Sequence, residues 1–392
     1  MSRRQPPLVP RMVENVYSIF GEMSALAVQV GAINLGQGFP DTDGPEVLKN
    51  AAIEAIRAGR GNQYPPVHGL PELRRAIADH QQRFYNVAVD WQTEVVVGTG
   101  ASEVLQAALL ALVEPGDEVI VFEPWFDLYA AGINLAGATR VAVPMVPPTY
   151  RPDVEALRAA VTPRTRVLLI NTPHNPTGIV FTREELQVIA DIACENDLIV
   201  LSDEVYEHLV FDGREHVSMA TLPGMAERTI TVGSGGKCFS FTGWKVGWAT
   251  GPADLIGAVR AVRQHLSFVS GGPFQWAMAE GLALPGDYFS GLARQMQDRR
   301  DQLTSGLAEL GFGIVPSEGT YFLTTDVRPL GYADGLTFCR DAVERCRVVA
   351  IPHQAFCDDP GERAGYVRWA FCKQPAVLDE ALERLSPLAD RS

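Results

Sequence analysis

Lys237 is the residue of this sequence whose chemistry is easiest to infer from its surroundings. It ends the segment Ser234-Gly235-Gly236-Lys237, and a glycine backbone lets a lysine approach a bound molecule closely. A lysine amine forms Schiff bases with carbonyl groups. The alternatives are a lysine on a flexible surface loop and the lysine of a nucleotide-binding P-loop. The P-loop pattern fails twice, because it requires glycine at 231 and serine or threonine at 238, where the chain has Thr231 and Cys238.

The elements that would position Lys237 are short runs of β-branched and apolar residues between about residues 94 and 251. A helical pattern over 184–196 separates two of them. The alternation of strand and helix predicts an α/β fold with a largely parallel sheet and helices on both faces. The runs cover 95–97, 119–122, 167–170, 198–201 and 229–232.

The segments that follow these runs are the candidates for a site, because ligands of such sheets bind at the carboxyl ends of the strands. They are rich in polar, aromatic and glycine residues. The segments are 98–102, 123–127, 171–176, 202–206 and 233–237. We therefore expect the functional site at that edge of the sheet.

The C-terminal part of the chain is patterned differently. A helical pattern over 291–310 precedes a strand-like segment at 319–323, a further helix and a second strand-like segment at 367–371. This order predicts a smaller α+β domain. The predicted division is an N-terminal arm that joins the small domain (1–44), a large domain (45–285) and a small C-terminal domain (286–392).

Composition limits the class of protein. A formal net charge of −14 in 392 residues argues against a nucleic-acid-binding surface. No apolar segment follows the charged N-terminus, and no stretch approaches about 18 apolar residues, so we expect neither a signal peptide nor a membrane partner. The six cysteines form no Cys-x-x-Cys pair and no zinc-ligand spacing, which indicates reduced thiols, a cytoplasmic protein and no metal site.

Four spaced motifs together resemble the fold-type-I, class I aminotransferases, which use pyridoxal 5′-phosphate. They are Asn175-Pro176-x-Gly178, Asp203-x-x-Tyr206, Ser234-x-x-Lys237 and Gly243-Trp244-Lys245-x-Gly247. Segments 34–41, 62–64 and 123–129 are similar to the kynurenine and glutamine aminotransferase subgroup. Segments 20–26, 63–66 and 321–323 are similar to actinobacterial N-succinyldiaminopimelate aminotransferases. The likeness covers nearly the whole chain.

The resemblance implies roles for the residues around the cofactor ring. Lys237 forms the Schiff base and then moves the substrate proton. Asp203 keeps the pyridine nitrogen protonated, which makes the ring an electron sink. Asn175 and Tyr206 hydrogen-bond the phenolate oxygen of the ring. Without the resemblance, Asp203 would be interpreted as a helix N-cap or loop carboxylate, Asn175 as a turn residue before proline and Tyr206 as a half-buried core tyrosine.

The resemblance also implies which residues stack on the ring and hold the phosphate. Phe126 is the stacking aromatic, with Trp125 as the alternative. Backbone N–H groups at a helix start, a hydroxyl and a charge bind the phosphate; they come from Ala101, Ser102, Ser234 and Lys245. Tyr64 would reach the phosphate from a neighbouring subunit, which implies a homodimer with shared active sites. The Gly98-Thr99-Gly100 segment is not a dinucleotide fingerprint, because residue 103 is glutamate.

Arg368 is the candidate for binding the substrate carboxylate through its bidentate fork, the alternative being a solvated arginine at a strand end. The resemblance assigns further residues to the substrate side: Gly38, Asn175, Phe20, Phe268 and Val269. His353 is a further pocket candidate, although a lone histidine is more often structural. Segment 267–273 lacks the second arginine of aspartate aminotransferases, which disfavours a dedicated aspartate enzyme.

We therefore expect a transferase that moves an amino group from an L-amino acid to a 2-oxo acid, with 2-oxoglutarate and glutamate as the partner pair. The candidate donor is N-succinyldiaminopimelate, a substrate of lysine biosynthesis. A broad kynurenine, glutamine or methionine aminotransferase and a cysteine-S-conjugate β-lyase stay open. A pyridoxal-phosphate decarboxylase fits the resemblance less well. A transcription regulator is disfavoured, because only about 30 residues precede the Asn34-Leu35-Gly36 motif.

Overall fold

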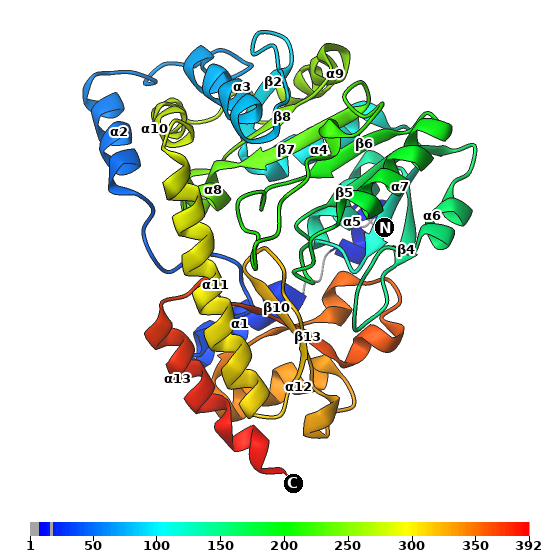
Figure 1. Cartoon of the computed structure of the whole chain (residues 1–392), viewed down its shortest axis with the longest axis vertical. Coiled ribbons are helices and arrows are strands. Elements are labelled where there is room, and N and C mark those ends of the chain that lie inside the picture. The colour runs from blue at the N-terminus through cyan, green and yellow to red at the C-terminus, as the bar shows by residue number, and fades with distance from the viewer. Residues whose placement is uncertain (1–7, 16–18, 392) are drawn as a thin grey trace, which may run out of the picture.

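The computed structural model describes residues 8–15 and 19–391 of the chain. Figure 1 shows a large sheet with its helices above a smaller group of strands and helices that contains the C-terminus. The large sheet has seven strands in the order β2-β8-β7-β6-β5-β3-β4. Their bounds are β2 Val95–Thr99, β3 Glu118–Glu123, β4 Thr139–Pro144, β5 Thr165–Asn171, β6 Ile199–Asp203, β7 Thr229–Ser234 and β8 Val246–Thr250.

The predicted α/β class is confirmed, and each of the five predicted runs lies wholly or almost wholly in a strand. The neighbouring pairs from β4 to β7 are parallel, whereas β8 runs antiparallel to both β7 and β2. Strands β4 and β8 are not predicted from the sequence. Strand β4 lies at the sheet edge and is only partly buried, so it lacks an apolar run. Strand β8 contains Gly247 and follows Lys245 directly, so its segment was interpreted as a binding motif.

Helices connect these strands and cover the sheet (Figure 1). The helix predicted over 184–196 is α7, Arg183–Glu195. Its start is fixed by a capping box, in which Thr182 Oγ1 accepts the Glu185 N–H and Glu185 Oε2 accepts the Thr182 N–H. The other helices around this sheet are α2 Glu46–Arg57, α3 Pro71–Tyr85, α4 Gly100–Leu112, α5 Asp127–Ala136, α6 Val154–Ala160, α8 Gly235–Cys238, α9 Ala253–Arg263 and α10 Gly272–Leu282.

The second sheet has four antiparallel strands in the order β12-β13-β10-β9. The strands are β9 Gly313–Val315, β10 Phe322–Asp326, β12 Ile351–Pro352 and β13 Tyr366–Ala370, and the helices of this part are α1 Ile19–Val30, α11 Gly286–Glu309, α12 Gly335–Asp341 and α13 Pro375–Leu385. The N-terminal segment joins this part, because β1 (Ile33–Asn34) pairs with β11 (Val348–Val349).

Two sequence expectations for this part need correction. The strand expected at 319–323 begins only at Phe322, because Gly319 forms an isolated bridge with Val210 and the chain turns at Thr320. The N–H groups of Gly319 and Thr320 bond to the carbonyls of Gly178 and Leu209. Thr320 has a φ of 69°, which a strand does not allow. The helix expected from 291 begins earlier, at Gly286. No helix among residues 8–15 and 19–391 is both long and apolar enough to cross a membrane.

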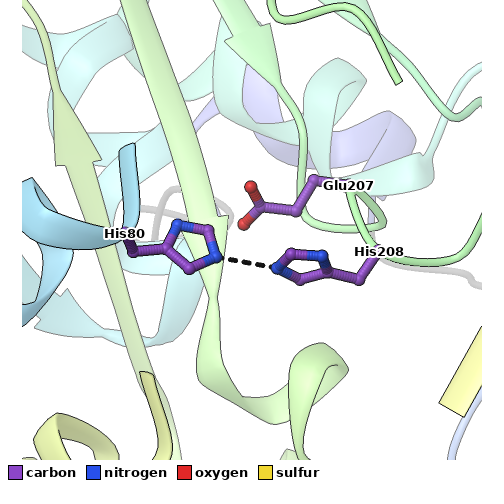
Figure 2. A group of neighbouring side chains, drawn as sticks. All are labelled: His80, Glu207 and His208. Atoms are coloured by element: carbon purple, nitrogen blue, oxygen red, sulfur yellow. Dashed lines mark hydrogen bonds between the residues drawn. The ribbon is translucent and has the colours of Figure 1, made fainter. Parts of the chain in front are cut away.

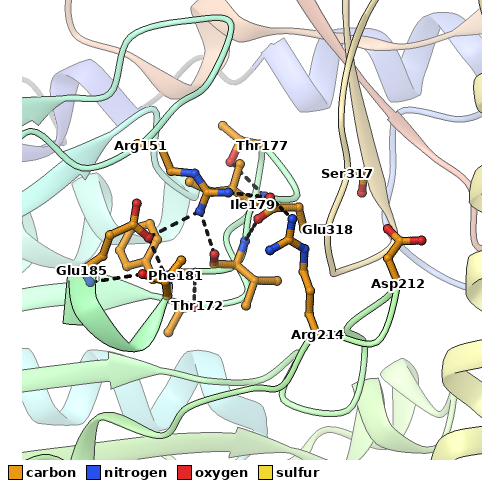
Figure 3. A network of polar contacts seen from close by, with 12 residues as sticks. Arg151, Thr172, Thr177, Ile179, Phe181, Glu185, Asp212, Arg214, Ser317 and Glu318 are labelled. Atoms are coloured by element: carbon orange, nitrogen blue, oxygen red, sulfur yellow. Dashed lines mark hydrogen bonds and ion pairs between the residues drawn. The ribbon is translucent and has the colours of Figure 1, made fainter. Parts of the chain in front are cut away.

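Glu318 fastens the loop before β10 to the large sheet, as Figure 3 shows. Its carboxylate accepts the Val180 N–H at 2.9 Å and pairs with Arg214 at 2.8 Å and with Arg151. Arg151 in turn donates to the Val180 carbonyl at 2.8 Å. Glu318 is only 7% exposed, so these contacts satisfy a charge that water barely reaches. They hold the two sheets in a fixed relation.

Replacing Glu318 by glutamine should lower the free energy of unfolding by about 1–3 kcal/mol, since a largely buried charge-assisted network loses its anion. Urea unfolding followed by circular dichroism measures the change. Glu195→Gln is the matched control, because Glu195 is half-exposed in its pair with Arg158 and should cost less than about 1 kcal/mol. Equal effects in the two variants would show that Glu318 is an ordinary surface charge.

Candidate active site

A pocket of about 440 Å³ lies at the carboxyl ends of the large sheet's parallel strands, with β10 and β13 of the second sheet on its other side. Most of the predicted site residues line it: Phe20, Gly38, Ala101, Ser102, Phe126, Asn175, Asp203, Tyr206, Ser234, Lys237, Lys245 and Arg368. These residues come from segments more than 340 positions apart in the sequence. The fold therefore brings most of the predicted site residues, which are far apart in the sequence, into one pocket.

Five residues considered from the sequence lie outside this lining. Trp125 is buried beneath the Arg140 guanidinium, so Phe126 is the aromatic that faces the pocket. His353 is buried and contacts the hydroxyls of a tyrosine and a threonine. Tyr64 is 80% exposed and packs edge-on against Phe268 at 5.2 Å. Val269 lines a separate shallow hollow with Tyr64.

Lys237 lies in the single turn of α8, directly after β7. Gly235 allows this turn to pack closely, because a Cβ there would lie 2.4 Å from the Met278 sulfur. The Lys237 Nζ donates to the Tyr321 hydroxyl at 2.6 Å, and that hydroxyl donates to the Gly38 carbonyl at 2.5 Å. Burial lowers the pKa of Lys237 to about 8. More of this amine is thus neutral, and nucleophilic, near neutral pH than the ordinary lysine pKa of 10.5 would allow.

Asp203 ends β6 and is 3% exposed. Its carboxylate accepts the Tyr129 hydroxyl at 2.6 Å and the Val205 N–H at 3.3 Å. Burial nevertheless raises the pKa of Asp203 to about 6, against these hydrogen bonds and the nearby positive charge of Lys237. The carboxylate is short of positive charge, and a cationic N–H donor placed in the pocket would supply it.

Another part of the pocket lining, at the start of α4, offers hydrogen-bond donors and positive charge. The first N–H groups of α4, at Gly100, Ala101 and Ser102, have no partner within their own helix. Lys245 lies beside them, since a Cβ on Gly100 would be 3.0 Å from its Nζ. Gly247 allows β8 to approach, because a Cβ there would lie 2.3 Å from the Ala101 nitrogen. This arrangement suits a phosphate group.

Glu103 explains why a dinucleotide fingerprint is absent at this helix. Its Oε2 accepts the Thr99 N–H at 2.5 Å, and its Oε1 accepts the Ser267 N–H at 3.1 Å. The position where the fingerprint requires glycine therefore carries a carboxylate that fixes the start of α4.

Arg368 enters the pocket from β13 and is 2% exposed. Its Nη1 donates to Asn175 Oδ1 at 2.8 Å and its Nη2 to the Gly36 carbonyl at 2.7 Å. The Phe322 ring lies 3.9 Å from the guanidinium carbon. Burial lowers the pKa of Arg368 to about 10, so the group stays charged at neutral pH. Its buried Nε has no hydrogen-bond partner among the described residues. A carboxylate ligand would compensate this charge.

Sequence reasoning missed several side chains of the site. Tyr129 and Tyr321 bond to Asp203 and Lys237, although both lie in segments that carried the resemblance. Asn171 donates from Nδ2 to the Asp203 carbonyl at 2.8 Å and accepts the Asn175 N–H at 2.7 Å. The available signal was position, since Asn171 ends β5 where ligand-contacting residues were expected.

The fold and the pocket together define a class, and comparison with known proteins agrees with it. Residues 30–385 match the family described as aminotransferase class I and II. The chain belongs to this family, whose members depend on pyridoxal 5′-phosphate, and it is an aminotransferase.

Among its relatives is a Mycobacterium tuberculosis protein named "Probable N-succinyldiaminopimelate aminotransferase", 51% identical across 98% of this chain and 99% of the relative. A solved structure of N-succinyldiaminopimelate aminotransferase from that organism aligns with a TM-score of 0.95 at 52% identity, covering 97% of this chain and all of the other. The Escherichia coli methionine aminotransferase is more distant, at 38% identity over 97% of this chain and 99% of the relative.

The raised pKa of Asp203 predicts how the cofactor-free protein responds to pH. Because the folded pKa lies above the ordinary value of 3.8, the folded chain binds the proton more tightly, and stability falls as pH rises from about 4 to 6. Asp203→Asn should therefore unfold at higher temperature than the wild type at pH 7.5, with a gain of at most about 3 kcal/mol. The gain should disappear near pH 4.

Thermal melts of the cofactor-free proteins at the two pH values measure this effect. Asp298→Asn, at an exposed position of α11, is the control and should change little at either pH. An Asp203→Asn protein that is less stable than the wild type at pH 7.5 would contradict the inference that the ionised Asp203 carboxylate destabilises the cofactor-free fold.

Proposed function

We propose that this aminotransferase transfers the amino group between N-succinyldiaminopimelate and the 2-oxoglutarate/glutamate pair, with pyridoxal 5′-phosphate as cofactor. The observation that carries the substrate assignment is the 51% identity to the Mycobacterium tuberculosis relative over almost the full length of both chains. The relative named for methionine is less similar, at 38% identity. The chemistry of the pocket carries the cofactor assignment.

The pocket residues fit pyridoxal 5′-phosphate at four points. The N-terminus of α4, Ser234 and Lys245 suit its phosphate, and Phe126 its ring face. The buried Asp203 suits a protonated ring nitrogen, since burial raises its pKa in spite of the nearby Lys237 and a cationic donor would stabilise its ionised form. Lys237 would hold the aldehyde group covalently. When bound, this cofactor is an electron sink for the negative charge left at the substrate α-carbon after loss of its proton.

Lys237 would act again as the base of the reaction. Once the amino acid has displaced it, its amine would remove the proton from the substrate α-carbon. The same amine would then pass this proton to the carbon that carries the aldehyde group of the cofactor. A pKa lowered to about 8 suits a base that works near neutral pH. The Tyr321 hydroxyl, 2.6 Å away and anchored on Gly38, would fix the direction of the Nζ lone pair.

Arg368 and Asn175 would orient the substrate. Arg368 uses one N–H of each terminal nitrogen on Asn175 and Gly36, so a second N–H of each is free for the α-carboxylate. Asn175 accepts this bond with its oxygen, which leaves its amide NH₂ to donate to the ring oxygen of the cofactor. Tyr206, also in the lining, would donate to the same oxygen.

We also propose a homodimer in which Tyr64 completes the partner's phosphate site. Tyr64 is 80% exposed, and Phe268 and Leu266 nearby are 45% and 47% exposed. Such a group of exposed apolar side chains favours a protein interface. The predicted domain division at about residues 45 and 286 is proposed with it.

Lys237→Ala should abolish turnover, with kcat reduced more than about 10⁴-fold, because the covalent anchor and the base are both lost. The variant should keep the wild-type circular dichroism spectrum. The assay follows glutamate formation from N-succinyldiaminopimelate and 2-oxoglutarate. Lys49→Ala, on the outer helix α2, should keep full activity. Comparable turnover by the two variants would refute the role of Lys237.

Among amino donors, N-succinyldiaminopimelate should react at least as fast as glutamate and faster than the other amino acids. The measurement is a stopped-flow half-reaction without any oxo acid, in which the cofactor absorbance is followed with N-succinyldiaminopimelate, glutamate, glutamine, kynurenine and methionine. The rate with N-succinyldiaminopimelate should match or exceed that with glutamate and exceed the others at least tenfold. A faster reaction with kynurenine or methionine would reject the assignment. Pyruvate release from a β-substituted cysteine would reveal β-lyase activity.

A further inference from the structure

A second group of potential ligand side chains lies outside the pocket lining, and two of its members directly follow Tyr206 in the sequence. Figure 2 shows His80, Glu207 and His208 pointing toward one another. We call these residues the His–Glu–His cluster. His80 comes from α3, and the other two are consecutive residues of the turn after β6. One potential ligand atom from each residue lies within 4.8 Å of those of the other two.

We propose that the His–Glu–His cluster binds a divalent transition-metal ion of the zinc type. Two imidazoles and one carboxylate are a donor set that such ions accept, and a water molecule can complete a tetrahedron. The His80 and His208 Nε2 atoms are 2.7 Å apart. Zinc–nitrogen bonds of about 2.0–2.1 Å require the two nitrogens to lie roughly 3.3 Å apart. A rotation of the side chains that separates them by about half an ångström admits the ion.

Burial of the cluster separates it from an ordinary surface group. His80 is 2% and Glu207 4% exposed. A hydrogen bond between the two imidazoles accounts for one nitrogen of each ring, but Glu207 Oε1 is buried without a hydrogen-bond partner among the described residues. An unpaired buried carboxylate oxygen is costly, and a bound cation would satisfy it.

The protonation states suit metal binding as well. Burial lowers the pKa of His80 to about 3 and moves that of His208 in the same direction, so both imidazoles are neutral and keep a lone pair for a metal. Burial raises the pKa of Glu207 to about 7, opposed by a hydrogen bond from Tyr85. A cation would favour the ionised carboxylate, and Tyr85 would act as the outer partner that orients it.

Aromatic side chains pack against the cluster on one side, and a surface hollow gives an ion access to it on another. Phe84 and Phe289 pack against both imidazoles, with ring centroids 4.2–6.0 Å apart. A hollow of about 360 Å³ reaches His80 from the surface, with Glu72 and Asp79 on its rim beside two arginines. The guanidinium of one of them, Arg83, donates to the Leu284 carbonyl and lies over the Phe84 ring.

The consequence for the enzyme is structural. Glu207 and His208 follow Tyr206 directly, and Asp203 lies three residues before it. An ion bridging this turn to α3 would hold the segment that carries Tyr206 and Asp203. We therefore expect the ion to raise thermal stability, and any effect on turnover to be indirect.

The test uses the untagged holoenzyme, stripped with a chelator and titrated with Zn²⁺ in equilibrium dialysis and with Co²⁺ by visible absorption. The wild type should bind one ion per chain at the cluster, with tetrahedral Co²⁺ bands and a raised Tm. His80→Gln, Glu207→Gln and His208→Gln should each weaken binding more than about 100-fold, because loss of an outer partner alone costs about 10–100-fold. His265→Gln, an exposed histidine of the same chain, should bind like the wild type.

Absence of stoichiometric binding to the wild type would overturn the proposal, as would binding that the three cluster variants leave unchanged. If these variants fail to fold, anomalous diffraction from zinc-soaked wild-type crystals decides the question. A peak between the three side chains supports the site, and a peak only elsewhere refutes it. These readouts do not depend on the amino donor, so they stand apart from the proposed function.

Discussion

The burial of charge in one pocket is the constraint on which the rest of this structure depends. The carboxylate of Asp203 and the guanidinium of Arg368 are almost entirely removed from water, and the amine of Lys237 is partly buried. None of the three forms an ion pair with a described residue. Neutral donors and acceptors hold them instead: two tyrosine hydroxyls, an asparagine amide and a backbone carbonyl. Such an arrangement costs stability and leaves each charge available to a ligand.

The two sheets share the task of keeping these charges in place. Lys237 and Asp203 follow strands of the large sheet, whereas Arg368 lies in β13 and Tyr321 directly precedes β10. The hydrogen bond from Arg368 to Asn175 crosses from one sheet to the other, and so does the bond between Lys237 and Tyr321. Outside the pocket, Glu318 ties the same loop region to the segment after β5. Because the contacts of Glu318 help to hold the two sheets together, the charged side chains inside the pocket can remain without ion pairs.

Much of this arrangement could be predicted from the sequence, for reasons specific to the elements concerned. The central parallel strands are buried on both faces, so their apolar runs are visible, and residues at their carboxyl ends share one edge by geometry. Strand β8 is not predicted, because its glycine and its position directly after Lys245 are typical of a binding loop. Strand β4 is not predicted, because a strand at the edge of the sheet is only partly buried and needs no apolar run. Whether Trp125 or Phe126 faces the pocket depends on the turn between β3 and α5, which composition does not report.

The hydrogen-bond partners of the site residues could not be predicted, because they are remote in sequence. Tyr129 and Asp203 are 74 positions apart, Lys237 and Tyr321 are 84 apart, and His80 and His208 are 128 apart. No periodicity links such pairs, since the link is made by the packing of one element on another. The resemblance supplied the residues that contact the cofactor in related enzymes but not the side chains behind them.

The way Arg368 is held has a consequence for selectivity. Its hydrogen-bond partners, an amide oxygen and a backbone carbonyl, are neutral, and the Asp127 carboxylate in the same pocket attracts it without forming an ion pair. If Arg368 binds the substrate α-carboxylate as proposed, a methyl ester or a primary amide of the same amino acid would match the shape of the substrate but would give this guanidinium no anion to pair with. On that proposal the pocket would discriminate on ionisation first and on side-chain shape second, and blocked amino acids would be poor ligands however well their side chains fit.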